Sequence, residues 1–163
     1  MKLQDIPLFK SLTDEELSIL QVKLKRVEFK AGDTIIEEGE VDDTMYIFES
    51  GKVKITRKLT LKIGTRWGEA EKAMDILDAK QVSFFGEMSL VTGAPRSATI
   101  TAITDCVLYT LSSKDLKEIA EKYPSIGYKI MEEIATVLAE RVRKLNDTVL
   151  KLTTALSLVI SKR

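Results

Sequence analysis

The chain has 163 residues, 44% of them hydrophobic, and its 25 basic residues balance its 25 acidic residues. This length and composition are typical of one globular domain with its own core, and the net charge of zero argues against the broad basic surface of a strong nucleic-acid binder. The absence of histidine excludes an imidazole base and nearly all zinc sites, and the single cysteine, Cys106, excludes an intrachain disulfide and a cysteine-ligated cluster.

The sequence also lacks membrane signals. No apolar run reaches the length of a membrane span, and the N-terminal residues contain no long apolar segment. We therefore expect a cytoplasmic protein that does not bind membranes. Cys106 begins the alternating apolar stretch Cys106–Leu111, which predicts a buried structural thiol rather than a reactive one.

The first predicted element is a short helix. Thr13 followed by Glu16 forms a capping-box pattern, which satisfies backbone N–H groups at a helix start. The apolar face of this helix consists of Leu17, Ile19, Leu20 and Leu24.

A series of short strands follows, from about Val27 to Leu111. Each is enriched in β-branched or aromatic residues or alternates apolar with polar residues, and glycine turns separate several of them. Many short strands with regular turns predict a mainly β fold, an antiparallel β-roll or jelly roll with flanking helices. The stretch Thr60–Glu71, which holds Gly64, Trp67 and Gly68, is interpreted as a long hairpin connection. The predicted strands are Val27–Phe29, Thr34–Ile36, Met45–Phe48, Val53–Thr56, Ala73–Leu77, Ala98–Ala102 and Val107–Leu111.

The last block is helical. Ser112 with Asp115 predicts a capped helix to about Lys122, and Pro124 suits the first turn of the next helix. We therefore divide the chain into residues 1–124, the roll with its N-terminal helical segment, and residues 125–163, a long C-terminal helix.

That last helix carries an apolar stripe with alternating spacings of four and three residues. Such a heptad pattern favours a two-chain coiled coil, and hence a homodimer. The alternative is a helix that packs only on its own roll. The stripe consists of Leu138, Val142, Leu145, Val149, Leu152, Leu156 and Val159.

The segment 85–99, with the sequence FGEMSLVTGAPRSAT, carries the functional signal. Gly86 permits a close backbone approach to a ligand, and the single helical turn that follows offers N–H groups to an anion. The planar fork of Arg96 matches two phosphate oxygens, and Glu87 can only accept hydrogen bonds, as from a sugar hydroxyl. The two residues together indicate a ligand with both a hydroxyl and a phosphate.

This segment resembles the phosphate-binding cassette of cyclic-nucleotide-binding domains, the family of the catabolite activator protein and the protein kinase A regulatory subunit. The family pattern F-G-E-[LIM]-[AS]-L, then [PA]-R-[SAT]-A-[TS], is matched at every element with the usual spacing between Glu87 and Arg96. The turn glycines Gly32, Gly39 and Gly51 fit the family as well, and the resemblance covers about residues 8–145.

The resemblance implies a β-roll with flanking helices and a cyclic purine nucleotide held against the cassette. Glu87 and the backbone of Gly86 would bind the ribose 2′-hydroxyl, and Arg96 would pair with the exocyclic phosphate oxygens. The backbone N–H groups of Ser89 and Ser97 would complete the phosphate cradle. No separate cofactor and no metal are implied.

Two positions bear on the choice of ligand. At the position of Ser97, proteins like the catabolite activator protein often carry Ser, whereas family members selective for cGMP carry Thr, whose hydroxyl reaches the guanine. Ser97 keeps the hydroxyl without the methyl group, so cAMP is the first choice and cGMP remains open. Arg141 falls where relatives cap the purine with the C-terminal helix, and it could stack on the base or donate to it. The alternative for Arg141 is a solvated charge beside Glu140.

These features predict a cyclic-nucleotide sensor without catalytic activity, which responds to its ligand as a dimer. Transcription factors of the family carry a helix-turn-helix after the long helix, and the sequence printed here shows none, so we expect no DNA binding by this chain. Two alternatives stay open: a ligandless structural or interaction module, and the sensor fragment of a DNA-binding regulator.

Overall fold

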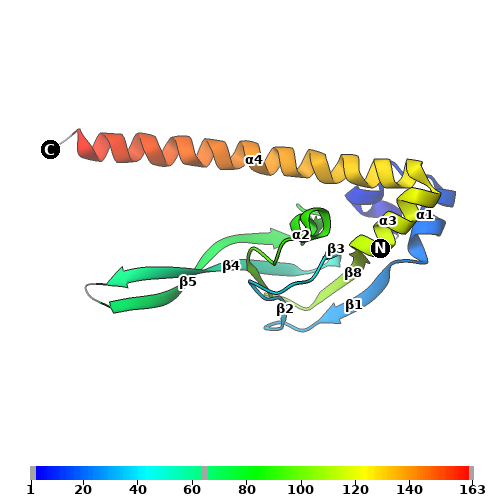
Figure 1. The fold of residues 1–163 in the computed structure, drawn as a ribbon, viewed down its shortest axis with the longest axis horizontal. Helices are drawn as coiled ribbons and strands as arrows, with labels where there is room; N and C mark the ends of the chain where they lie inside the picture. Colours follow the sequence, from blue (N-terminus) through cyan, green and yellow to red (C-terminus); the bar gives the residue numbers. More distant parts are fainter. Residues whose placement is uncertain (1–2, 64–65, 162–163) are drawn as a thin grey trace.

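The computed structural model describes residues 3–63 and 66–161, and for residues 60–71 it describes the backbone alone. Within these residues, two four-stranded antiparallel sheets form the roll, with strand orders β1-β8-β3-β6 and β2-β7-β4-β5. Helices cover one end, and the last of them extends past the roll on the same side as the β4–β5 hairpin (Figure 1). The strands are β1 (Lys25–Phe29), β2 (Thr34–Ile36), β3 (Thr44–Ser50), β4 (Lys52–Ile63), β5 (Arg66–Asp78), β6 (Phe84–Phe85), β7 (Thr99–Ala102) and β8 (Cys106–Ser112). The helices are η1 (Leu3–Asp5), η2 (Pro7–Phe9), α1 (Asp14–Gln21), α2 (Glu87–Thr92), α3 (Ser113–Lys122) and α4 (Pro124–Ile160).

The core of the roll lies between the two sheets. Alternate residues of the strands point inward, so that Phe48, Val53 and Leu108 are almost fully buried. Cys106 is buried in the same cluster, as predicted, and burial raises the pKa of its thiol. Each large apolar side chain buried in this way contributes roughly 1.5–3 kcal/mol to folding.

A second core joins the helices to one sheet. Ile126, Ile130 and Ile134 are spaced by four residues along the first turns of α4, so they share one face of that helix. They pack with Leu20 of α1 and Ile47 of β3. The first part of α4 therefore belongs to the packed body of the molecule, while the division of the chain at residue 124 stays a prediction.

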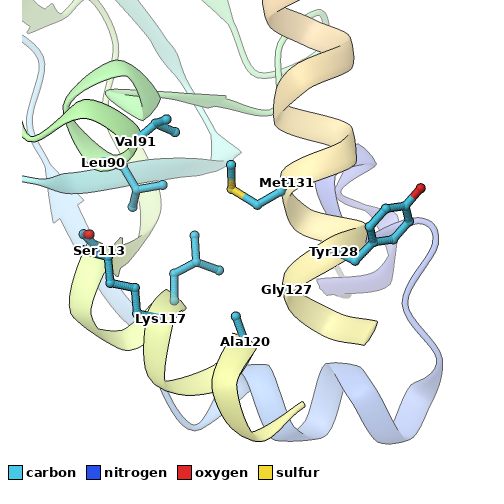
Figure 2. A pocket seen from close by; sticks show the side chains of 9 residues that line it. Leu90, Val91, Ser113, Lys117, Ala120, Gly127, Tyr128 and Met131 are labelled. Carbon is cyan, nitrogen blue, oxygen red and sulfur yellow. The ribbon is translucent and has the colours of Figure 1, made fainter. Parts of the chain in front are cut away.

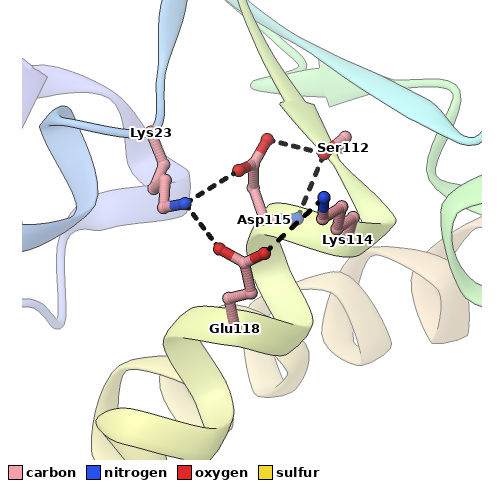
Figure 3. Close-up of polar contacts among 5 residues, drawn as sticks. All are labelled: Lys23, Ser112, Lys114, Asp115 and Glu118. Carbon is pink, nitrogen blue, oxygen red and sulfur yellow. Dashed lines mark hydrogen bonds and ion pairs between the residues drawn. The ribbon is translucent and has the colours of Figure 1, made fainter.

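Both predicted helix caps are present. The hydroxyl of Thr13 accepts from the N–H of Glu16 at 3.2 Å, and the carboxylate of Glu16 accepts from the N–H of Thr13 at 2.9 Å. Ser112 likewise caps α3 by accepting from the N–H of Asp115 at 3.1 Å. Figure 3 shows this cap beside Lys23, whose ammonium bridges Asp115 and Glu118 and so connects the segment after α1 to α3.

The roll differs from the prediction in two places. Of the stretch 60–71, interpreted as a connection, residues 60–63 continue β4 and residues 66–71 belong to β5, while Gly64 and Thr65 lie outside the described residues. The alternation of apolar and polar residues in this stretch is compatible with strand, and its glycines are compatible with a loop. The cross-strand pairing of β4 with β5 shows that it is strand. Strand β6 was not predicted, because its two residues are too few to show an alternation.

Beyond Arg141, helix α4 has little contact with the other residues that the structure describes, although the ammonium of Lys144 lies 3.8 Å from the carboxylate of Asp75. Every stripe residue from Val142 to Val159 is at least 50% exposed, whereas Leu138 is partly buried against the helical core. In the part of the chain that the structure describes, no helix has the length and apolarity needed to traverse a bilayer.

Candidate functional site

Two glycines set the geometry of the segment 85–99. Gly86 and Gly93 flank α2 with φ of 80° and 69°, in the left-handed region that other residues rarely adopt. Gly86 also permits a close approach, because a Cβ there would lie 2.9 Å from Nη1 of Arg96 and 3.1 Å from the carbonyl oxygen of Thr44. The turn before α2 is therefore packed directly on the arginine.

Arg96 is a buried cation that is held by several acceptors. The residue is only 4% exposed, and its Nη2 donates to Oδ2 of Asp42 at 2.5 Å and to the carbonyl of Thr44 at 2.6 Å. Nη1 donates to the carbonyl of Gly86 at 3.2 Å. These acceptors compensate for the loss of hydration, which a buried guanidinium requires.

Asp42 is the counter-ion of this arginine. Burial raises the pKa of the Asp42 carboxyl. The hydrogen bonds from Arg96 and Thr44 together lower it by more than burial raises it, so the pKa lies below its ordinary value. The carboxylate is 40% exposed while the guanidinium is 2% exposed. Of the two partners, Asp42 is thus the one with room to move into solvent.

Glu87 is a buried anion paired with the C-terminal helix. The residue is 2% exposed, and its Oε1 accepts from Nη1 of Arg141. Arg141 also donates from Nη2 to the carbonyl of Phe84 at 3.1 Å, and its guanidinium lies 5.7 Å from the centre of the Phe84 ring. This pair joins α4 to the segment 85–99 across 54 residues of sequence.

Both charged groups line one cavity of about 100 Å³. Its walls are otherwise mostly apolar, which suits a flat organic group, and Ser97 and Ser89 lie at its edge. Ser89 is buried, whereas Ser97 is exposed with its hydroxyl 3.9 Å from the sulfur of Met88. The apolar lining residues are Ile36, Ile55, Leu77, Phe85, Met88, Ala98 and Ile100.

All six residues predicted for the site line this cavity: Gly86, Glu87, Ser89, Arg96, Ser97 and Arg141. Arg141 lies against Glu87 rather than in solvent beside Glu140, and Glu87 and Arg96 pair with other residues rather than with each other. The binding roles assigned to these residues stay predictions.

Sequence reasoning missed Asp42. The run 37–43, EEGEVDD, has the composition of a solvated acidic turn, yet Asp42 accepts from the buried arginine of the site. The sequence offers one local signal, Asp42 two residues before Thr44, where a carboxylate can accept from the backbone at the start of a strand. That pattern predicts a turn but does not indicate the distant arginine.

The arrangement can bind an organic phosphate without any metal. A guanidinium, a carboxylate and a mostly apolar lining in one cavity match a ligand with a phosphate, a hydroxyl and a flat apolar face. Across the described residues, no three side chains among His, Cys, Asp and Glu lie close enough to hold a metal ion.

Known proteins resemble this chain over most of its length. Residues 26–123 match the family model of the cyclic nucleotide-binding domain. The chain is 32% identical over 145 residues to the potassium/sodium hyperpolarization-activated cyclic nucleotide-gated channel 2 of Mus musculus, and 31% identical over 146 residues to channel 1 of Homo sapiens. These alignments cover 89% and 90% of this chain but only 15% of each channel.

Solved structures agree on the fold. The catabolite activator protein of Thermus thermophilus superposes with a TM-score of 0.71 at 28% identity, over 90% of this chain and 63% of that one. The N-terminal domain of a transcriptional regulator from Streptomyces coelicolor gives a TM-score of 0.66 at 31% identity, over 90% and 94% of the two chains. With the family model matching residues 26–123 and the predicted roll present, the chain belongs to the cyclic nucleotide-binding domain family.

Proposed function

We propose that this chain is a sensor module that binds cAMP in the cavity between Glu87 and Arg96 and, through Arg141, changes the position of α4. The observation that carries the proposal is a buried guanidinium and a buried carboxylate on the walls of one largely apolar cavity. The regulatory domain of protein kinase A from Toxoplasma gondii, solved with cAMP, superposes with a TM-score of 0.56 at 26% identity and supports the choice of ligand.

The phosphate of the ligand would replace Asp42 at Arg96. The guanidinium is fixed by two carbonyls, and the carboxylate of Asp42 is the more exposed partner, so an incoming phosphate can take its place without moving the arginine. A phosphate with two free oxygens accepts both arms of the fork, which a single carboxylate oxygen does not. Binding therefore exchanges one counter-ion for another rather than leaving a buried charge unpaired.

The ribose hydroxyl would compete with Arg141 for Glu87. The carboxylate now accepts from Arg141, and a hydroxyl that donates to the same carboxylate weakens this ion pair. Because Arg141 belongs to α4, occupancy of the cavity changes the free energy of holding that helix in place. This exchange of partners is the step that would convert binding into a movement.

The exposed stripe of α4 would transmit that movement to a second copy. Its half-exposed residues continue in heptad spacing from Val142 to Val159, which is the pattern of a two-stranded coiled coil. We therefore propose a homodimer joined by the distal part of α4. The chain performs no catalysis in this proposal.

A melting experiment with cAMP, cGMP and AMP tests the ligand. A nucleotide at about 100 times its Kd stabilises the folded protein by about 2.7 kcal/mol, which shifts the melting temperature of a domain of this size by several degrees. We expect a shift with cAMP, a smaller shift with cGMP and none with AMP. The same melting temperature with and without each cyclic nucleotide would overturn the proposal.

Substitution of the arginine tests the site. Arg96→Ala should weaken cAMP binding by roughly 2–5 kcal/mol, because the phosphate loses a desolvated charged partner. Arg96→Lys keeps the charge without the planar fork and guards against a folding defect in the alanine variant. Arg57→Ala removes an arginine that is 54% exposed on β4 and does not line the cavity, and it should leave calorimetric affinity unchanged. Unchanged affinity in both Arg96 variants contradicts the assigned role.

One observation favours a second function, a ligandless scaffold. Both charged groups of the cavity already have partners within the chain, Asp42 and Arg141, so the structure satisfies its buried charges without a nucleotide. A scaffold of this kind would show no stabilisation by any nucleotide while still forming the coiled coil. The melting experiment thus separates the two functions.

A further inference from the structure

A second and larger cavity lies outside the nucleotide site, where α2, α3 and α4 meet. Its volume is about 270 Å³, and Figure 2 shows Leu90, Ala120 and Met131 pointing into it from the three helices. The two cavities share no lining residue, although both are bounded by α2. The proposed function leaves this cavity unused.

The walls of the cavity are apolar and partly open to solvent. Leu90 and Leu116 are buried at its base, while Val91 of α2 and Met131 of α4 remain 48% and 39% exposed. Gly127 brings α4 so close to α3 that a Cβ there would lie 2.5 Å from the Cβ of Ala120. The helices therefore meet tightly at one end and diverge toward Leu90 and Met131, which leaves the space open.

Three polar side chains belong to this lining, and one of them, Tyr128, donates its hydroxyl to Glu132 at 3.0 Å. Lys117 provides its only charge, and its ammonium has no ion-pair partner among the residues that the structure describes. Ser113, one turn earlier on α3, is 7% exposed, and its hydroxyl makes no hydrogen bond to any described residue. The hydroxyl oxygen itself is reached by solvent, so it is free to donate to a ligand.

We infer that this cavity binds a small amphipathic carboxylate, with its hydrocarbon part between Leu90, Leu116 and Met131 and its carboxylate at Lys117 and Ser113. A carboxylate accepts from both the ammonium and the hydroxyl, so one ligand group satisfies both. Ligand cavities usually span roughly 300–1,000 Å³, and the 270 Å³ found here favours a small molecule. A nucleotide does not fit this chemistry, because one lysine and one hydroxyl cannot also meet its sugar and base.

The methionine methyl groups provide a direct test by NMR. Met131 lines this cavity, Met88 lines the nucleotide cavity and Met74 lies on β5 away from both. We expect sodium octanoate, below its micelle-forming concentration, to shift the Met131 methyl signal saturably while the Met74 and Met88 signals stay in place. Equal shifts at all three methyls would mean nonspecific adsorption and would overturn the inference.

Variants and a neutral analogue test the role of charge. Lys117→Gln should weaken octanoate binding roughly fivefold and leave 1-octanol binding unchanged, because only the carboxylate senses the ammonium. The matched control is Lys114→Gln, on the same helix and 83% exposed, which should leave both affinities unchanged.

A third variant fills the space. Ser113→Leu places a larger side chain in the cavity and should abolish the Met131 shift with either ligand, while cAMP still shifts the Met88 signal if the nucleotide site is used. Octanoate affinity that is insensitive to both Lys117→Gln and Ser113→Leu would overturn the inference and leave the cavity as a contact surface for another protein. Loss of the cAMP response alone would instead contradict the proposed function.

Discussion

At the scale of single residues, the main feature of the candidate site is a pair of nearly buried charges of opposite sign, Glu87 and Arg96. A buried ion without a partner costs several kcal/mol, which explains why each has an opposite charge at hydrogen-bond distance. The partners, Asp42 and Arg141, are 40% and 35% exposed and can therefore yield to a ligand. Such a site stays satisfied in the empty state and can exchange partners when it is filled.

The glycine before α2 provides a residue-scale test of this packing. Gly86→Ala and Gly93→Ala both force alanine into the left-handed region, which costs roughly 1–2 kcal/mol of stability in each case. Only the methyl at position 86 meets other atoms, with Nη1 of Arg96 at 2.9 Å, whereas position 93 has nothing within 4 Å. We expect Gly86→Ala to be the less stable variant and to lose nucleotide affinity as well.

Urea unfolding and calorimetry on the two variants measure these effects. Gly93→Ala is the matched control, since it carries the same backbone penalty without the contact to Arg96. Equal losses of stability and affinity in the two variants would show that the close approach at Gly86 has no role in the site.

The sequence predicts some of these residues better than others. Gly86, Glu87 and Arg96 lie within one short segment of fixed spacing, so their association is readable from the chain. Asp42 lies 54 residues before Arg96, and only the folding of the roll brings the two together. Arg141 and Glu87 were both predicted for the site, but the ion pair between them was not. That contact depends on where α4 crosses α2, which no local pattern gives.

At the scale of elements, Glu16 connects the start of α1 to the start of α4. Its carboxylate accepts from the ammonium of Lys129 at 2.7 Å and from the hydroxyl of Ser125 at 2.7 Å, besides its role in the cap of α1. The hydrogen bond from Lys129, with those from the Thr13 backbone and Ser125, lowers the pKa of Glu16 to about 2 from an ordinary 4.5. Ionised Glu16 therefore holds two helices that are far apart in sequence.

This shift predicts a pH dependence that Glu16→Gln removes. A carboxyl whose pKa is lowered by folding stabilises the folded state above its unfolded pKa, and that contribution is lost as the pH falls from about 4.5 toward 2. The wild type should thus exceed Glu16→Gln in stability at pH 7, and the difference should shrink below pH 4.5. Glutamine still accepts from the backbone, so the variant isolates the charge.

Urea midpoints at a series of pH values from 7 to 2 test this. Glu15→Gln removes an exposed carboxylate from the same helical turn that has no contact with Lys129, and it serves as the control. A difference between wild type and Glu16→Gln that stays constant with pH would show that the ion pair to Lys129 does not stabilise the fold.

The elements themselves were predictable to different degrees. The caps at Thr13 and Ser112 depend on neighbours three residues away, so the sequence contains everything needed to predict them. Strand β6 depends instead on its pairing with β3, and the full length of β4 and β5 depends on their mutual register. Such long-range pairing is not encoded in any local pattern.

At the scale of the whole molecule, the first part of α4 is packed in the core and its second part is exposed to solvent. Its first turns bury Ile126, Ile130 and Ile134, and the Glu87–Arg141 pair marks the point where it leaves the body of the chain. Past that point, among the described residues, Lys144 lies 3.8 Å from the carboxylate of Asp75, while the stripe residues from Val142 to Val159 are at least half exposed. A partner helix packed on the exposed stripe would bury these apolar side chains, which is why the homodimer belongs to the proposed function.

The double variant Leu145→Asp, Leu152→Asp tests that partner. Both residues are more than 60% exposed on the stripe, so aspartate there costs the single chain little but places like charges across a two-chain seam. Sedimentation at tens of micromolar should show a dimer for the wild type and a monomer for the variant. Thr154→Asp places a single aspartate on the opposite side of the helix, and this variant should remain dimeric. A wild type that sediments as a monomer with and without cAMP would restrict α4 to its own roll, and ligand binding would then have to act through the Glu87–Arg141 pair within one chain.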